Sequence, residues 1–189
     1  MNWERLQPYD EAILNDIADG DYRRALGTLV RGYQQAIVGF CHNMLGDDAW
    51  AEETAQDIFL DAYKAMPRFR QQASVRTWLF AIARKKCLQV RRNRDRRGRI
   101  QQDKQEIIAQ SAHREPPVAT EDDPATLLQR VRQSLEQLPD VERELLIMRY
   151  DTGLAVADIA QIRGISMATV RRHLARALET LREVIDSEA

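Results

Sequence analysis

The most strongly charged stretch of the chain lies between Arg68 and Lys104. It holds thirteen arginine or lysine residues and two acids, so its net charge is +11, although all 189 residues together carry only −1. Three aromatic residues interleave with these bases: Phe69, Trp78 and Phe80. Cationic side chains neutralise phosphates and aromatic rings stack on unpaired bases, so the stretch predicts a nucleic-acid surface. The alternative interpretation is a solvated basic helix face.

A second pattern that could bind nucleic acid lies near the C-terminus. Residues 156–163 form a short amphipathic helical pattern that ends at Gly164, and Ser166 can cap a second helix that begins at Met167. The pattern has a small residue where the two helices would touch, a glycine in the turn and an apolar anchor in the second helix. These residues are Ala160, Gly164 and Val170. This spacing predicts a helix-turn-helix rather than an ordinary helical hairpin.

The second helix of this pattern has two faces. Its apolar stripe is expected to consist of Val170, Leu174, Leu178, Leu181 and Ile185. The opposite face carries Thr169, Arg172 and Arg176, with Arg171 and His173 beside it. Arginine can make bidentate contacts with guanine, so this face is predicted to enter the major groove of DNA.

An acidic stretch precedes the basic one. Six acids and no base lie between positions 47 and 61: Asp47, Asp48, Glu52, Glu53, Asp57 and Asp61. Such a helix face suits a basic protein partner, and the alternative is a solvated face near a helix N-terminus, where acids are favoured.

The elements that must position these residues are all expected to be helices. Apolar residues recur at helical spacing through residues 10–95 and again from Leu127, with a break at Pro139-Asp140 and a further helical segment from Val141 to Tyr150. Residues 97–124 lose this periodicity and contain Pro116, Pro117 and Pro124. We therefore expect an all-α protein with an N-terminal domain at 1–96, a flexible linker at 97–124 and a C-terminal helix-turn-helix domain at 125–189.

Other kinds of chemistry find little support in the sequence. Cys41 and Cys87 lie 46 positions apart, which offers no zinc spacing and favours two small packing residues. The three histidines are scattered, and no nucleotide-binding, nucleophile-elbow or metalloprotease motif occurs. No apolar run approaches the roughly 20 residues of a membrane span. We therefore expect a soluble, cytoplasmic protein that is not an enzyme, needs no cofactor or metal and does not insert into membranes.

Three segments together closely resemble the bacterial extracytoplasmic-function (ECF) sigma factors of the primary sigma family. They are the run Ala51-Glu-Glu-Thr-Ala-Gln-Asp-Ile-Phe-Leu-Asp-Ala-Tyr-Lys64, the run Phe69-Arg-(five residues)-Arg76-Thr-Trp-Leu-Phe-Ala-Ile-Ala-Arg84, and the C-terminal helix-turn-helix. The resemblance covers nearly the whole chain in order. It implies an alternative sigma factor that joins core RNA polymerase, recognises two promoter elements and helps to open the DNA.

The resemblance also implies roles for individual residues. The clamp helices of the largest polymerase subunit are expected to bind Glu53, Gln56, Asp57 and Asp61. The DNA-binding residues expected at the minus-ten element are Arg68, Phe69, Arg70, Arg76, Arg84, Lys85, Arg91 and Arg92. Those expected at the minus-thirty-five element are Ser166, Thr169, Arg171, Arg172 and Arg176. An inhibitory anti-sigma factor is expected from the family alone.

Three features of the N-terminal domain qualify these roles. Phe69 is expected to hold an extruded base, whereas Trp78 falls on the apolar stripe and is expected in the core. Many relatives have Asn and Asp where this chain has Lys85 and Gln89, so their rules for the minus-ten element do not transfer. The dense basic run at 91–97 is expected to contact phosphates rather than to read bases.

Two other functions fit parts of the sequence. A free-standing helix-turn-helix regulator would bind a palindromic operator as a homodimer, without polymerase. A module that binds only proteins is disfavoured by the basic stretch at 68–104.

Overall fold

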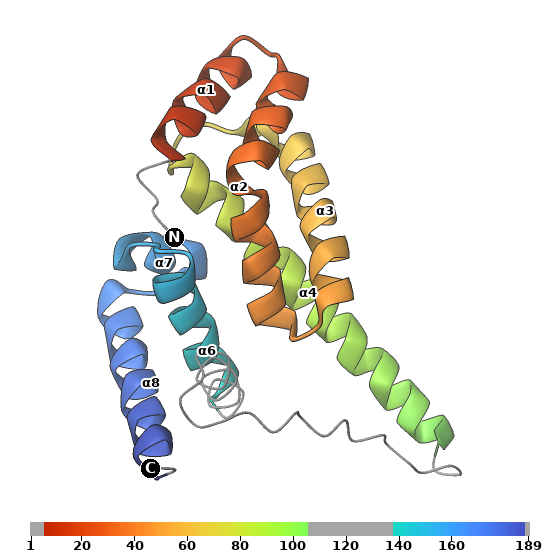
Figure 1. Ribbon diagram of the computed structural model, residues 1–189, viewed down its shortest axis with the longest axis vertical. Coiled ribbons are helices and arrows are strands. Elements are labelled where there is room, and N and C mark those ends of the chain that lie inside the picture. The colour runs from red at the N-terminus through yellow and green to blue at the C-terminus, as the bar shows by residue number, and fades with distance from the viewer. Residues whose placement is uncertain (1–5, 106–137, 188–189) are drawn as a thin grey trace, which may run out of the picture.

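The computed structural model describes residues 6–105 and 138–187, and every regular element in these ranges is helical. The N-terminal unit contains α1 (Gln7–Ala18), α2 (Tyr22–Leu45), α3 (Asp48–Ala65), the short 3₁₀ turn η2 (Met66–Arg68) and α4 (Val75–Gln105). The C-terminal unit contains α6 (Asp140–Leu146), the π-helical turn η3 (Ile147–Asp151), α7 (Val156–Arg163) and α8 (Met167–Ser187). The all-α, two-domain prediction is confirmed, as Figure 1 shows.

Short polar and glycine signals set the boundary between α2 and α3. Gly46 ends α2 in the left-handed conformation, with φ of +69°, and its N–H donates to the carbonyl of His42. The side chain of Asp47 then caps α3 by accepting a hydrogen bond of 3.0 Å from the N–H of Trp50. These two neighbouring residues turn the chain sharply, so α2 and α3 pack side by side along their length.

Helix α2 runs through the middle of the N-terminal core. Tyr33, Ile37 and Phe40 on α2 are fully buried, as are Ile58 on α3 and Phe80 on α4. The rings of Phe40 and Phe80 meet edge to face, with centroids 5.4 Å apart. The apolar stripes of the three helices thus form one core that holds the acidic face of α3 and the basic face of α4 in fixed positions.

Helix α1 is attached to α2 by a close contact and a buried polar bond. A Cβ atom on Gly32 would lie only 3.0 Å from the ring of Tyr9, so the two helices approach closely at this glycine. The hydroxyl of Tyr33 donates to Asp10 over 2.6 Å. Burial and this hydrogen bond raise the pKa of Tyr33 above its ordinary value, so the hydroxyl stays protonated and remains a donor.

The C-terminal unit has a small core of its own, formed around Leu145, Met148, Leu154, Ile159 and Val170, all fully buried. On α8 the apolar stripe differs from the expected one. Val170 and Leu174 are buried as predicted, but Leu178 is 45% exposed and Ala177 takes the buried position instead. The stripe follows the offsets 0, 4 and 7 of an α-helix, whereas 170, 174 and 178 drift off the buried face.

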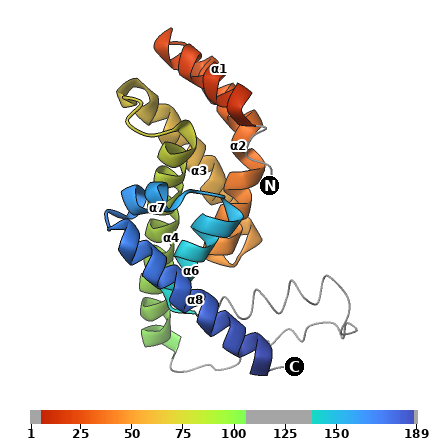
Figure 2. The same cartoon turned by 90° about the vertical axis from the view of Figure 1, so that its left-hand side faces the viewer.

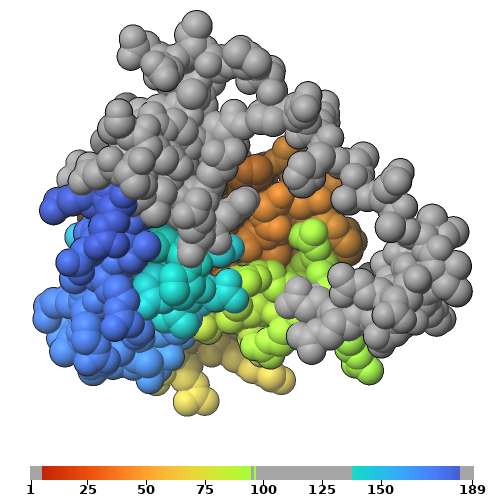
Figure 3. Space-filling view, turned by 90° about the horizontal axis from the view of Figure 1, so that it is seen from below, coloured from red at the N-terminus to blue at the C-terminus, as the bar shows by residue number. Residues whose placement is uncertain are grey.

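The two units lie against each other, with α7 packed on α4 and η3 on α2 (Figures 1 and 2). In the space-filling view α6, in cyan, lies between α8 and α4 (Figure 3). Helix α4 continues to Gln105, beyond residue 96, where the N-terminal domain was expected to end. The rest of the linker predicted at 97–124 and the expected helical segment from Leu127 to Leu138, except Leu138 itself, lie outside the described residues.

In the part of the chain that the structure describes, no helix is long and apolar enough to cross a lipid bilayer.

Candidate nucleic-acid interface

The helix-turn-helix has the geometry expected from its sequence. Helix α7 ends at Gly164 with φ of +66°, and the N–H of Ile165 donates back to the carbonyl of Ala160. The hydroxyl of Ser166 caps α8 by accepting a hydrogen bond of 3.1 Å from the N–H of Thr169. Because Ala160 and Val170 are both buried, the turn orients α8 against α7 as the spacing predicted.

The outer face of α8 presents three arginines to solvent. Arg171, Arg172 and Arg176 are exposed, whereas Thr169 is half-buried and its hydroxyl lies 2.9 Å from that of Ser166. His173 faces inward instead, with Nδ1 2.8 Å from the buried carboxylate of Glu142 on α6. The face is therefore a compact guanidinium surface that the α6–α8 contact holds in place.

A second candidate surface for nucleic acid lies at the loop before α4, where side chains line a cavity. Phe69 packs on Trp78, with ring centroids 4.7 Å apart, and both rings line a cavity of about 370 Å³. Trp78 was expected in the core, but it is half-buried and forms part of this cavity wall. Gln71, at the tip of the loop, has a positive φ of 54°, which few non-glycine residues adopt. The loop and the first turn of α4 together thus place a pair of aromatic rings next to the exposed Arg68 and Arg70.

The remaining predicted DNA-binding residues of the N-terminal unit divide into two groups. Exposed side chains form the first group: Arg68, Arg70, Lys85 and Arg92. The second group consists of half-buried side chains: Arg76, Arg84 and Arg91. Arg76 lies close enough to Asp10 that its charge lowers the pKa of that carboxyl, against the larger opposing effect of burial.

Two residues of the second group bind acids of the C-terminal unit. The Nε of Arg84 donates to Glu144, and Arg91 donates to Asp140 over 2.6 Å. Sequence spacing could not show these contacts, because the paired residues are separated by 60 and 49 positions.

The acidic face of α3 is exposed as predicted but is not free of partners. Glu53, Gln56 and Asp57 are exposed and Asp61 is half-buried. The ammonium group of Lys86 on α4 lies 3.2 Å from Asp57 and 2.9 Å from Asp61. The hydrogen bond to Asp61 is the main cause that raises the pKa of Lys86, so the lysine stays charged between the two carboxylates.

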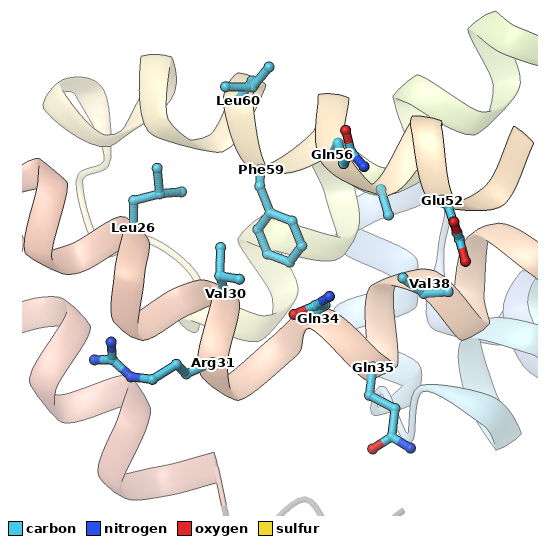
Figure 4. A pocket seen from close by; sticks show the side chains of 11 residues that line it. Leu26, Val30, Arg31, Gln34, Gln35, Val38, Glu52, Gln56, Phe59 and Leu60 are labelled. Carbon is cyan, nitrogen blue, oxygen red and sulfur yellow. The ribbon is translucent and has the colours of Figure 1, made fainter. Parts of the chain in front are cut away.

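An open groove of about 860 Å³ runs between α2 and α3, beside this acidic face. Figure 4 shows Phe59 pointing from α3 toward Val30 and Gln34 of α2, whereas Leu60 points away from them. Leu60 is 53% exposed. Sequence reasoning missed Leu60 and Lys86, although an apolar residue among exposed polar neighbours is a usable signal of a contact surface.

The cysteines lie next to each other in the N-terminal core. Both are fully buried and their sulfur atoms are 3.7 Å apart. The hydrogen bond to Cys41, together with burial, raises the pKa of Cys87 far above its ordinary value. Within residues 6–105 and 138–187, no group of three or more His, Cys, Asp or Glu side chains could hold a metal ion.

Comparisons with known proteins match both units. Residues 29–97 match the family model of sigma-70 region 2, and residues 128–181 match that of sigma-70 region 4. The RNA polymerase sigma-H factor of Pseudomonas aeruginosa is 30% identical over 93% of each chain. The ECF RNA polymerase sigma factor SigC of Mycobacterium tuberculosis is 32% identical over 84% of this chain and 82% of its own.

Solved structures have the same fold. CnrH, in complex with the cytosolic domain of CnrY, matches with a TM-score of 0.71 and 22% identity over 96% of this chain and 99% of its own. The sigma factor RpoE of Bartonella quintana, in complex with the anti-sigma factor NepR, matches with a TM-score of 0.64 and 24% identity over 89% and 99% of the two chains.

The matched family is sigma-70, so the expected assignment to the primary sigma family is corrected to the sigma-70 family. With both regions matched in order and relatives at least 30% identical over most of the chain, the protein belongs to the ECF group of RNA polymerase sigma factors.

Proposed function

We propose that this chain is an alternative sigma factor that binds core RNA polymerase and directs it to promoters with two recognition elements. One observation carries the proposal. A helix-turn-helix with an exposed arginine face and a basic helix with an aromatic-lined cavity at its start occur in one chain. A regulator that only binds duplex DNA needs the first feature, whereas promoter opening also needs the second.

Core polymerase is proposed to bind the surface formed by α3 and the α2–α3 groove. Its polar part is the row Glu53, Gln56, Asp57 and Asp61, and its apolar part includes Leu60 and Phe59. An apolar centre flanked by acids suits a helical partner with basic side chains, because the charges orient the partner and the apolar contact supplies affinity. Lys86 holds two of the acids in place and is proposed as a positioning residue.

The two DNA contacts are proposed on different units. Arg68, Phe69 and Arg70 would contact the opened minus-ten element, with Phe69 and Trp78 as the stacking surface. Arg172 and Arg176 would read bases of the minus-thirty-five element, while Arg171 would contact phosphates. The boundaries 1–96, 97–124 and 125–189 are proposed as the functional units, with α4 extending beyond the first of them.

The same proposal covers regulation and location. Because CnrH and RpoE were solved with CnrY and the anti-sigma factor NepR, we propose that an anti-sigma factor binds this chain as well. The protein would act in the cytoplasm, where the polymerase works. It would supply binding and positioning, while the polymerase supplies the chemistry of RNA synthesis.

The proposal is tested by transcription in vitro. Purified chain and bacterial core polymerase are incubated with fragmented genomic DNA, and RNA 5′ ends are sequenced. We expect start sites that need both proteins and share two upstream elements. Specific binding to a palindrome by the chain alone, without polymerase-dependent starts, would instead support the homodimeric regulator.

A charge reversal tests the polymerase surface. The Asp57 side chain is 52% exposed, and Asp61 still holds Lys86 when Asp57 is replaced, so Asp57→Arg should fold normally. We expect Asp57→Arg to lose co-purification with core polymerase in moderate salt, since reversal brings like charges together. Glu11→Arg, at an exposed position on α1, is the matched control and should keep it. Equal retention of both variants would remove Asp57 from the interface.

A further inference from the structure

Lys86 and Arg94 of α4 face the α2–α3 hairpin. Lys86 holds two carboxylates of α3, as described above. Arg94 donates to the carbonyl of Leu45 over 3.1 Å, and its guanidinium lies 5.8 Å from the centre of the Trp50 ring. Both cations are therefore engaged within the N-terminal unit, although Arg94 lies in the basic run that was expected to contact phosphates.

Arg84 and Arg91 of α4 face the C-terminal unit. Arg91 donates to Asp140, and Arg84 donates to one oxygen of Glu144. The other oxygen of Glu144 accepts a hydrogen bond from Arg163 of α7. Each of these two cations of α4 is thus paired with an acid.

A further side of α4 is exposed and carries cations without acids. Its exposed side chains follow one another at intervals of four, three and four residues, namely Lys85, Gln89, Arg92 and Arg96. Such intervals place residues on one face of a helix. Within residues 6–105 and 138–187, none of these four side chains forms a hydrogen bond or an ion pair with another residue. These four residues, the outer row of α4, therefore form a cationic surface with no internal counter-charge.

The outer row is unfavourable in the free chain and suits a polyanion. Arg92 and Arg96 are four residues apart, and like charges at this spacing destabilise a helix. Phosphates along a DNA strand would offset that repulsion, since guanidinium and ammonium groups bind phosphate oxygens. The row begins seven residues after Trp78, on the cavity wall, and runs toward the end of α4 that projects beyond the α2–α3 turn in Figure 1. DNA that leaves the cavity would then follow α4 along this row.

Gln89 is the uncharged member of the outer row. Its amide carries a donor and an acceptor, which match N6 and N7 of adenine in the major groove of DNA. Lys85 lies four residues before it and Arg92 three residues after it. Phosphate contacts position a protein on DNA, whereas base contacts specify the sequence. An amide between two cations thus has the arrangement that reading one base requires.

We propose that the outer row of α4 binds duplex DNA next to the opened segment, and that Gln89 determines specificity there by reading one adenine. Lys85, Arg92 and Arg96 contact phosphates. The stacking surface at the start of α4 takes the unpaired DNA, and the outer row takes the paired DNA on the other side of the junction. This inference rests on the proposed function, because it extends the minus-ten contacts from the cavity to a second face that reads duplex.

The length of α4 limits where this adenine lies. Trp78 and Gln89 are 11 residues apart, which is about 16 Å along an α-helix with a rise of about 1.5 Å per residue. One base pair occupies about 3.4 Å of the DNA axis, so the separation spans at most about five base pairs. The upstream side is favoured, because the unit that follows α4 in the chain is proposed to bind the upstream element. The adenine is therefore expected within about five base pairs upstream of the base that stacks on Phe69 and Trp78.

Transcription from randomised promoters tests the proposal. The full chain and core polymerase act on one promoter whose base pairs upstream of the opened segment are randomised, and the transcribed templates are sequenced. We expect the wild type to prefer adenine at one of these positions by about fivefold or more. Gln89→Ala should lose this preference, and Gln89→Arg should move it to guanine, whose O6 and N7 accept hydrogen bonds from arginine. A loss of folding would not change which base is preferred.

Matched variants separate base reading from charge and stability. Asn15→Ala and Asn15→Arg make the same kinds of change at an exposed amide of α1 and should leave every base preference unchanged. Lys85→Ala and Arg92→Ala should weaken binding of the polymerase complex to every promoter variant alike. Each should also lower the number of counterions released on binding by about one.

Three results would overturn the proposal. If both Gln89 variants keep the wild-type preference at every position, Gln89 reads no base. If both lose transcription evenly across the randomised promoters, Gln89 has a structural role or contacts the DNA backbone. If Lys85→Ala and Arg92→Ala lose co-purification with core polymerase and keep the wild-type salt dependence of DNA binding, the outer row belongs to the polymerase interface. Absence of polymerase-dependent transcripts with the wild type would instead contradict the proposed function.

Discussion

Replacing Glu144 by glutamine is expected to destabilise the C-terminal unit strongly, although the two side chains have nearly the same size and shape. Glutamine keeps the shape of the side chain but replaces one acceptor oxygen by an amide group that donates. One of the two guanidiniums would then face a donor, and neither would have a counter-charge. The perturbation therefore tests the charge of a 5% exposed side chain rather than its packing.

The magnitude follows from the burial of the three groups. Loss of one partner from a buried ion pair costs about 3–5 kcal/mol, because the remaining charge stays desolvated. The side chains of Arg84 and Arg163 are 22% and 14% exposed, so some water can reach both guanidinium groups. We therefore expect a loss of unfolding free energy at the lower end of this range, about 3 kcal/mol. For a unit of about 60 residues this corresponds to a decrease in Tm of roughly 12–24 °C.

Urea and thermal unfolding, followed by far-ultraviolet circular dichroism, would measure the change in the full chain. Glu179→Gln, an exposed change of the same chemistry, is the control and should shift the free energy of unfolding by less than about 0.5 kcal/mol. A double-mutant cycle with Arg163→Ala and another with Arg84→Ala would separate the bond within the C-terminal unit from the bond between units. A loss below about 1 kcal/mol for Glu144→Gln would show that solvent screens the carboxylate and would refute the reasoning.

Three further predictions concern the recognition helix, pH and the thiols. Arg172→Ala should reduce the binding free energy for the matched upstream element by about 1–3 kcal/mol and relax the base preference at one or two positions. Arg171→Ala should instead weaken binding to all DNA sequences alike and reduce the slope of log binding constant against log salt concentration by about one. Binding to single-base promoter variants at two salt concentrations measures both effects. Burial raises the pKa of Glu142, but its hydrogen bonds and the nearby positive charges together lower the pKa by more than burial raises it. The net pKa of Glu142 is therefore below the ordinary 4.5. Its stabilising effect should therefore be complete above pH 4.5 and disappear as the pH falls through the lowered value, and urea unfolding between pH 3 and pH 7 should show a smaller pH slope for Glu142→Gln than for the wild type. Iodoacetamide should alkylate Cys41 and Cys87 only at the rate of global unfolding, because both thiols are buried and the pKa of Cys87 is raised. Rapid alkylation of the folded chain, detected by mass spectrometry, would contradict this prediction.

The features that the sequence predicted well are those set by neighbours along the chain. Gly164 ends α7 because the turn needs a residue in the left-handed conformation, and Ser166, two residues later, caps α8 by accepting a hydrogen bond from the N–H of Thr169. Both signals act within one helical turn, so they can be recognised without knowledge of the rest of the fold. The exposure of Arg171, Arg172 and Arg176 follows from the same local geometry.

The features that the sequence did not predict depend on contacts between distant segments. Lys86 was part of a basic block, and only the packing of α4 on α3 reveals that it binds Asp57 and Asp61. Leu178 was assigned to the core from a spacing of four, but the packing of α8 buries Ala177 instead. The pairing of Arg84 with Glu144 had no signal at all, since an acid 60 residues away looks the same in the sequence whether or not it makes a contact.

The order in which the two halves of the interface are synthesised has a consequence for the nascent chain. Arg84 leaves the ribosome 60 residues before Glu144, and at about 5–20 residues per second this is a delay of roughly 3–12 s. The four helices of the N-terminal unit can fold in that interval, because they make most of their contacts with one another rather than with the C-terminal unit. During translation the basic face of α4 therefore stands uncovered among ribosomal and messenger RNA, and the acids that cover it arrive last.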